Sequence, residues 1–285
     1  MTFSKHHATL KAGGCVQCRH RLRLNGTLVG HVAMTHGLLL GHSHIVCIQQ
    51  AVAELGPDLK NSLNGITLEL APIGAVHFQP NLTPDGALNP KIRKLVTADR
   101  FDVILSVIGG NTHCCLGLIN NPKPYDFVHP DLPDLLPNTA DALCLPYGLM
   151  LDILREMAQD ITPLLPAIRA LSDKPIWHLQ PPPPVADPSH LRRNALHFAE
   201  LIRAYGLAHP ARAYRFWRLQ CSMMEQICAP LDITPCPPPR AALDEDGMLA
   251  QPCWTEDPTH AGPAYGRAVL AQMATLLAPK IATVP

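Results

Sequence analysis

Short apolar runs that alternate with segments of helical spacing are the feature that most constrains the fold of this chain. The clearest run is Phe101–Ile108, which reads FDVILSVI and is closed by two glycines. Buried strands are predicted at 37–41, 66–71, 101–108 and 174–179. Helices are predicted at 43–55, 189–207 (with Ser189 as its N-cap), 209–229 and 263–277. Strands that alternate with helices indicate an α/β fold with a parallel sheet covered on both faces.

Proline marks the connections between these elements. The chain has 30 prolines, about twice the average usage. Because proline cannot donate to a strand ladder, the Pro-rich stretches at 130–137, 181–188 and 235–239 are interpreted as long loops on one scaffold. Ligands of parallel α/β sheets bind at the carboxyl ends of the strands, so the residues that come directly after each strand are the candidates for function.

Composition narrows the class of protein. A length of 285 residues favours one large domain or two small ones, and a hydrophobic content of 47% argues against a disordered chain. We expect a polar extension at 1–36 and one domain at 37–285. Lys+Arg and Asp+Glu both number 23, which argues against nucleic-acid and polybasic membrane partners. No apolar stretch approaches the ~18 residues of a membrane span.

The N-terminal segment bears on location and on the cysteines. It lacks the apolar core of a secretory signal, so a cytoplasmic protein is expected. The ten cysteines are then expected to be mostly reduced and buried. Cys15 and Cys18 form a C-x-x-C pair near His6, His7 and His20. A structural zinc site needs four ligands and a second C-x-x-C is absent, which favours free thiols over a metal site.

The first candidate cluster is Gly41-His42-Ser43-His44, where a predicted strand gives way to a helix. A serine there has its hydroxyl at the sheet edge and its N–H at a helix N-terminus, which suits a nucleophile whose oxyanion must be stabilised. An ordinary N-cap serine is the alternative.

The second cluster, Gly109-Gly110-Asn111-Thr112-His113, comes directly after the strongest strand. The glycines permit a tight approach of the backbone. The side-chain amide of Asn111 can then complete an oxyanion hole. The alternative is a turn in which Asn tolerates the left-handed conformation.

The third cluster, Asp257-Pro258-Thr259-His260, precedes the last predicted helix. A carboxylate three residues before an imidazole provides a general base and the acid that orients it. The alternative is a helix start capped by Asp257 or Thr259.

Together, the order of these clusters resembles the SGNH hydrolases, also called GDSL esterases/lipases, over about residues 37–280. The most specific part is DPTHAGPAYG, which is preceded by DEDGML. The resemblance implies a flavodoxin-like three-layer α/β/α sandwich and a serine esterase acting on a small-molecule ester without cofactor or metal. Residue by residue, the resemblance implies Ser43 as nucleophile, His260 as general base and Asp257 as the partner of His260. The oxyanion donors that it implies are the backbone N–H groups of Ser43 and Gly74 and the side-chain amide of Asn111.

The sequence also departs from that pattern. His42 stands where the family usually carries Asp, and Thr112 where Asp often follows Asn111. These departures keep a second hypothesis open, a relative without catalysis or with altered chemistry that binds a small molecule or carbohydrate in the same cleft. A third is a metal-binding protein, because His42, His44 and His113 are expected near Cys114 and Cys115. Polar lining of a wet cleft is the simpler account of these histidines, and substrate recognition is another.

Overall fold

The computed structural model describes residues 35–59, 63, 65–137 and 142–278. The chain divides into residues 1–32 and a second unit of residues 33–285, which contains all the described residues. The predicted C-x-x-C pair and its neighbouring histidines lie outside the described residues. The first strand begins at Thr35, so the last two residues of the predicted extension belong to the sheet.

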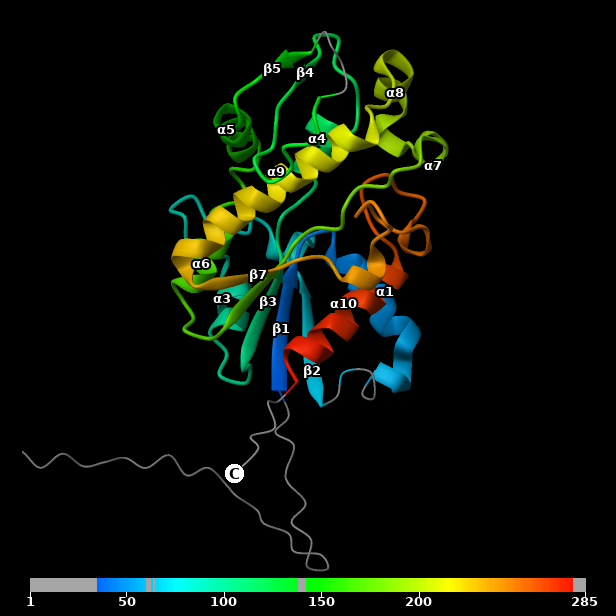
Figure 1. The fold of residues 1–285 in the computed structure, drawn as a ribbon. Coiled ribbons are helices and arrows are strands. Elements are labelled where there is room, and N and C mark those ends of the chain that lie inside the picture. Colours follow the sequence, from blue (N-terminus) through cyan, green and yellow to red (C-terminus); the bar gives the residue numbers. More distant parts are fainter. Residues whose placement is uncertain (1–34, 60–62, 64, 138–141, 279–285) are drawn as a thin grey trace, which may run out of the picture. The chain divides into compact units, whose positions relative to one another are not determined.

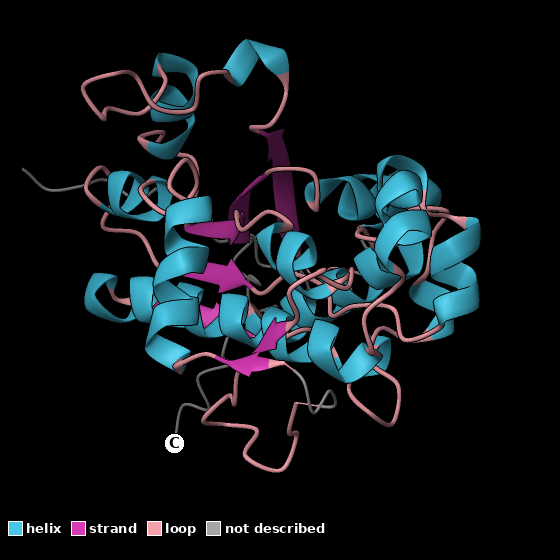
Figure 2. Ribbon diagram, turned by 90° about the horizontal axis from the view of Figure 1, so that it is seen from above, coloured by secondary structure: helices cyan, strands magenta, loops and turns pink. Residues whose placement is uncertain are grey.

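A parallel sheet forms the centre of this unit (Figure 2), in the order β2-β1-β3-β6-β7. All neighbouring strands pair in parallel, and Leu39 of β1 lies opposite Leu70 of β2 and Leu105 of β3. This order is the flavodoxin-like arrangement 2-1-3-4-5, and the predicted fold class is confirmed. The strands are β1 (Thr35–Gly41), β2 (Ile66–Pro72), β3 (Val103–Val107), β6 (Ile176–Leu179) and β7 (Ile233–Cys236).

Helices cover both faces of the sheet, as Figures 1 and 2 show. Successive side chains of a strand point to opposite faces, so Leu38 and Leu40 pack in one core and Leu39 in the other. The helices on the Leu39 face are α1 (Ile45–Leu55) and α10 (Pro263–Leu276). Those on the Leu38 face are α3 (Pro90–Val96), α5 (Tyr147–Met157), α6 (Leu164–Arg169) and α9 (Pro210–Cys228). The result is a three-layer α/β/α sandwich.

The helix predicted at 189–207 is wrong as a single element. It is broken into α7 (Pro188–Arg193), a 3-10 turn at Leu196–Phe198 and α8 (Ala199–Tyr205). Its N-cap is Asp187 rather than Ser189, because the Asp187 carboxylate accepts the Ser189 N–H at 2.7 Å.

The loop predicted at 235–239 is partly wrong, because Pro235 and Cys236 belong to β7. β7 is the last strand in the order and pairs only with β6 among the described strands. A proline is tolerated on such an edge strand, because one side of the strand needs no ladder donor. Pro181–Pro184 form a loop as predicted.

A smaller strand pair lies above the sheet in Figure 1, formed by β4 (Tyr125–Asp126) and β5 (Leu143–Cys144). A buried ion pair between Asp126 and Arg215 of α9 anchors it. Arg215 also donates to the carbonyl oxygens of Leu135 and Leu136. Both leucines lie in the Pro-rich stretch 130–137, which the sequence predicts only as a loop. In the described part of the chain, no helix has the length and apolar character needed to cross a membrane.

Candidate active site

The structure brings Asn111, Asp257 and His260 into one hydrogen-bonded chain. Nδ1 of His260 lies 3.0 Å from Oδ1 of Asp257, and its Nε2 lies 3.1 Å from the amide nitrogen of Asn111. Asn111 comes after β3 and the other two precede α10, so two distant segments meet at the carboxyl end of the sheet. The imidazole is therefore held from both sides.

Asp257 orients this loop as well as the imidazole. Its Oδ1 also accepts the N–H groups of Thr259 and His260, at 2.7 and 3.0 Å, and the Thr259 hydroxyl at 2.9 Å. Burial disfavours the charged form, but these hydrogen bonds and the contact with His260 outweigh it and hold the pKa of Asp257 well below its usual value. The carboxylate is thus ionised at neutral pH.

The contacts of His260 identify its tautomer. An ionised carboxylate at Nδ1 can only accept, so Nδ1 carries the hydrogen. The Asn111 amide can only donate through its nitrogen, so Nε2 offers a lone pair. This is the tautomer that a general base needs, with the accepting nitrogen turned away from the carboxylate.

Ser43 lies on the turn between β1 and α1 with its side chain exposed. Its hydroxyl makes no hydrogen bond to any residue that the structure describes, and the expected bond to His260 is absent. Its carbonyl accepts the N–H of Val46 at 3.1 Å, which closes the turn. The position at Nε2 that a nucleophile would use is occupied by the amide of Asn111.

Gly74 lies directly beside this turn. A Cβ built on it would be 3.7 Å from the Cα of His42, next to Ser43. Neither the Gly74 N–H nor the Ser43 N–H donates to another described residue, whereas the Ile73 N–H between β2 and Gly74 bonds to the carbonyl oxygen of Gly41 at 2.8 Å. Two adjacent turns thus leave backbone donors available at the same edge of the sheet.

His44 lies against the candidate base His260, a position that the sequence analysis did not predict for it. Its ring lies 5.2 Å from that of His260, and its Nε2 is 3.3 Å from the carbonyl oxygen of Gly110. Burial, together with the charges of His260 and His113, lowers the pKa of His44 to about 3. A neutral imidazole beside the base adds no positive charge at neutral pH. Thr259, whose hydroxyl contacts Asn111, Asp257 and His260, was likewise considered only as a helix cap.

A buried glutamine holds the turn that presents Asn111. Gln220 of α9 is fully buried and donates to the carbonyl oxygens of Gly109 and Gly110, both at 2.8 Å. Its oxygen accepts the N–H of His113 and faces Nδ1 of the same residue, both at 2.9 Å. Gly110 has a φ of +62°, and a Cβ there would meet Ile161 at 2.8 Å, so glycine is required. A polar residue on the buried face of a helix was the signal that could have identified Gln220.

Replacing Gln220 with Leu should destabilise the fold by about 2–5 kcal/mol, because each buried group left without a partner costs about 1–3 kcal/mol. Urea denaturation followed by circular dichroism measures this. Gln226→Leu, at an exposed position of the same helix, is the matched control; it removes only a solvent-exposed hydrogen bond from Arg155 and should change stability by less than about 1 kcal/mol. Equal effects of the two variants would show that Gln220 does not hold the turn.

The histidines predicted to form a polar, wet lining instead separate. His113 is 3% exposed and bonded to Gln220, and His44 is 6% exposed. Of the three, His42 alone borders a larger cavity of the described residues, with its Nε2 2.8 Å from Oδ1 of Asn81. Among the described residues, no three His, Cys, Asp or Glu side chains are grouped to hold a metal ion. Of the eight described cysteines six are buried, and Cys115 and Cys144 are exposed.

Cavities of very different size border the site. A cavity of about 440 Å³ touches His42 and Gly110, the neighbours of Ser43 and Asn111. Its other polar residues are Gln79, Asn81, Gln159 and Asp160. A much smaller space, of about 10 Å³, is lined by His260 and by the prolines of the 182–184 loop. The large polar cavity thus borders the turns that carry Ser43 and Asn111, whereas the space between His260 and the proline loop is nearly filled.

Comparisons with known proteins yield structural likeness only. No family profile and no curated protein matches the sequence. The fold is similar to the periplasmic domain of a lipopolysaccharide acetyltransferase of Salmonella ser. Paratyphi A, with 12% identity, TM-score 0.42, and coverage of 86% of this chain and 85% of that one. It is also similar to a mutant acetyl-xylooligosaccharide esterase of Geobacillus, with 15% identity, TM-score 0.39, and coverage of 87% and 95%.

A GDSL-like lipase of Bacteroides thetaiotaomicron is similar over 85% of this chain and 87% of that one, with 12% identity and TM-score 0.36. At this level of identity the likeness concerns the fold, and the reaction has to be inferred from the site itself.

Proposed function

We propose that the chain is a serine hydrolase that cleaves a carboxylic ester through an acyl-serine intermediate. The observation that carries the proposal is the chain from Asp257 through His260 to Asn111, in which Nδ1 is held by a carboxylate and Nε2 offers its lone pair. The available N–H groups of Ser43 and Gly74 support it, because they lie at the same sheet edge.

In this reaction the Ser43 hydroxyl takes the place of the Asn111 amide at Nε2 of His260. His260 accepts the hydroxyl proton while Ser43 Oγ attacks the ester carbonyl, and Asp257 stabilises the imidazolium. The oxyanion accepts hydrogen bonds from the backbone N–H groups of Ser43 and Gly74 and from the released side-chain amide of Asn111. Collapse expels the alcohol, which takes the proton from His260. Water, activated by the same base, then cleaves the acyl-serine ester and regenerates Ser43.

The cavities indicate which part of the substrate lies on each side. The cavity beside His42 and Gly110 has amide, imidazole and carboxylate side chains, which suits a hydroxylated alcohol portion. The space toward the proline loop is too small for a long chain, which favours a short acyl group. A short-chain ester of a polar alcohol is therefore the proposed substrate class.

A fluorophosphonate probe should label Ser43 and no other serine. Ser43→Ala should abolish labelling while the protein stays folded, because replacing a serine at such an exposed turn lowers stability by only about 1 kcal/mol. Ser189→Ala, at another exposed serine near a helix start, should label like the wild type. Mass spectrometry of the labelled peptide identifies the residue. A label retained in Ser43→Ala would exclude Ser43 as nucleophile.

Asn111→Ala should lower kcat by roughly 10²–10³ with little change in KM, because an oxyanion donor acts on the transition state. Its side chain does not cap α4 (Thr112–Gly117), so the helix should persist. Thr112→Ala, at the next position, is the control and should leave kcat within a few-fold. A loss confined to KM would mean that Asn111 binds substrate instead.

A second function, binding without catalysis in the same cleft, is favoured by one observation. The Ser43 hydroxyl makes no bond to His260, and the amide of Asn111 occupies the nitrogen that would activate it. If this arrangement persists with a ligand bound, the folded wild type will resist the fluorophosphonate probe entirely.

A further inference from the structure

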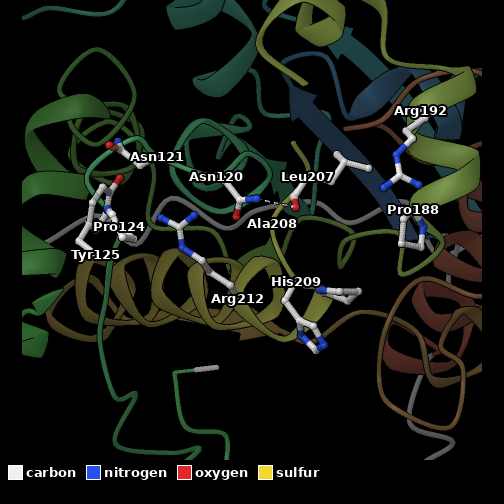
Figure 3. Close-up of a pocket in the computed structure, with 11 residues that line it drawn as sticks. Asn120, Asn121, Pro124, Tyr125, Pro188, Arg192, Leu207, Ala208, His209 and Arg212 are labelled. Carbon is white, nitrogen blue, oxygen red and sulfur yellow. Dashed lines mark hydrogen bonds between the residues drawn. The ribbon is translucent and has the colours of Figure 1, made fainter. Parts of the chain in front are cut away.

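A second large cavity lies away from the candidate active site. Its volume is about 470 Å³, within the range of small-molecule sites. Figure 3 shows it between the start of α9, helix α7 and the segment that leads from α4 to β4. α4 lies between Asn111 and this segment, a length of about 9 Å at 1.5 Å per residue. None of the residues assigned to catalysis lines the cavity.

Arg212 of α9 lines this cavity and is only 7% exposed. Its Nη1 donates to the carbonyl oxygen of Ile119 at 2.9 Å, whereas Nε and Nη2 are themselves buried and have no hydrogen-bond partner among the described residues, so a ligand would reach them only after the side chain shifts toward the cavity. The guanidinium also lies 5.1 Å from the ring centres of Tyr125 and Phe216, whose faces attract a cation. A buried cation with unused donors is costly unless an anion balances it.

No described carboxylate forms an ion pair with Arg212. The charge of the nearby Asp126 favours the cationic form of Arg212, but the Asp126 carboxylate is itself paired with Arg215. None of the described residues that line the cavity is acidic, and Arg192 of α7 adds a second cation. Figure 3 shows the side chains of Arg212 and Arg192 in different parts of the cavity, with Asn120 and Leu207 between them.

The remaining polar groups are mainly donors. His209 accepts the N–H of Ala211 at Nδ1, so a neutral His209 carries its hydrogen on Nε2. Asn121 accepts the N–H of Lys123 through its side-chain oxygen, which leaves its amide N–H₂ group to donate. The polar lining of the cavity is therefore rich in donors and carries two guanidiniums, and this favours a ligand with several negatively charged oxygen acceptors, such as a phosphate, over a carboxylate.

We propose that this cavity binds a small molecule through a phosphate group, with Arg212 as the central contact and Arg192 as a second cation. The proline, leucine and alanine side chains that complete the lining would contact the rest of the molecule. This site is separate from the proposed esterase site and does not depend on that proposal.

Calorimetric titration of the full chain with inorganic phosphate tests the site. Saturable binding is expected for the wild type, and Arg212→Gln should weaken it by about 10- to 100-fold, the effect of losing hydrogen bonds to a charged group. Acetate at the same concentration should not displace phosphate. Absence of saturable binding, or equal displacement by acetate, would overturn the phosphate site.

A matched pair on α7 keeps the test decisive if Arg212→Gln fails to fold. Arg192 lines the cavity and Arg193, its equally exposed neighbour, does not. Arg192→Gln should weaken phosphate binding several-fold, whereas Arg193→Gln should leave it unchanged. Equal weakening by both would indicate a general effect of net charge and would overturn the proposal.

Discussion

His260→Ala is expected to lower kcat/KM for p-nitrophenyl acetate by about 10⁴-fold or more, because no other group of the proposed site accepts the Ser43 proton. Ser43→Ala should have a loss of similar size. Since the two residues act in one step, the double variant should be little worse than either single variant. Asp257→Ala should cost less than His260→Ala, because the imidazole remains, although its Nδ1 loses the carboxylate 3.0 Å away.

The measurement is steady-state kinetics on the four variants and the wild type, each shown to be folded by circular dichroism. His197→Ala, at an exposed histidine outside the site, is the control and should retain wild-type activity. Full activity in His260→Ala, or losses of Ser43→Ala and His260→Ala that multiply in the double variant, would rule out a serine–histidine mechanism.

The folded chain is expected to lose stability steeply as the pH falls below about 6.5. Burial lowers the pKa of His113 and of His178 to about 4, and burial with neighbouring imidazoles lowers that of His44 to about 3. In the unfolded chain these residues bind protons near pH 6.5. Between the two values only the unfolded state is protonated, so stability present at neutral pH is lost on acidification.

Each of these three histidines lowers the free energy of unfolding by about 1.4 kcal/mol for each pH unit of acidification. Together they give a slope of roughly 4 kcal/mol per pH unit until the folded-state pKa values are reached. Guanidinium denaturation at pH 7, 6 and 5 measures it. His178→Leu should reduce the slope by the contribution of one histidine, about 1.4 kcal/mol per pH unit. His197→Leu, at an exposed position, should leave the slope unchanged. A stability that is constant from pH 7 to 5 would contradict the expectation.

Local pattern was sufficient for much of the fold. The apolar runs that became β1, β3 and β6 are largely buried on both faces, and parallel strands leave this signature in the sequence. The prolines at 181–184 identified a loop because they lack an N–H. Two predictions from local pattern were wrong because of neighbouring structure. Pro235 can belong to a strand because β7 lies at the edge of the sheet, and Asp187 rather than Ser189 caps α7.

The sequence by itself determined the parallel α/β architecture and which residue types come after its strands, because period and turn chemistry are properties of consecutive residues. Only the tertiary structure decided which of those residues meet. It joined Asn111 to His260, left Ser43 without a bond to His260, and placed Gln220 under the turn that carries Asn111. It also left Arg212 buried without an ion pair to any described carboxylate. Contacts between residues a hundred positions apart depend on how helices pack on the sheet, and no local pattern encodes that packing.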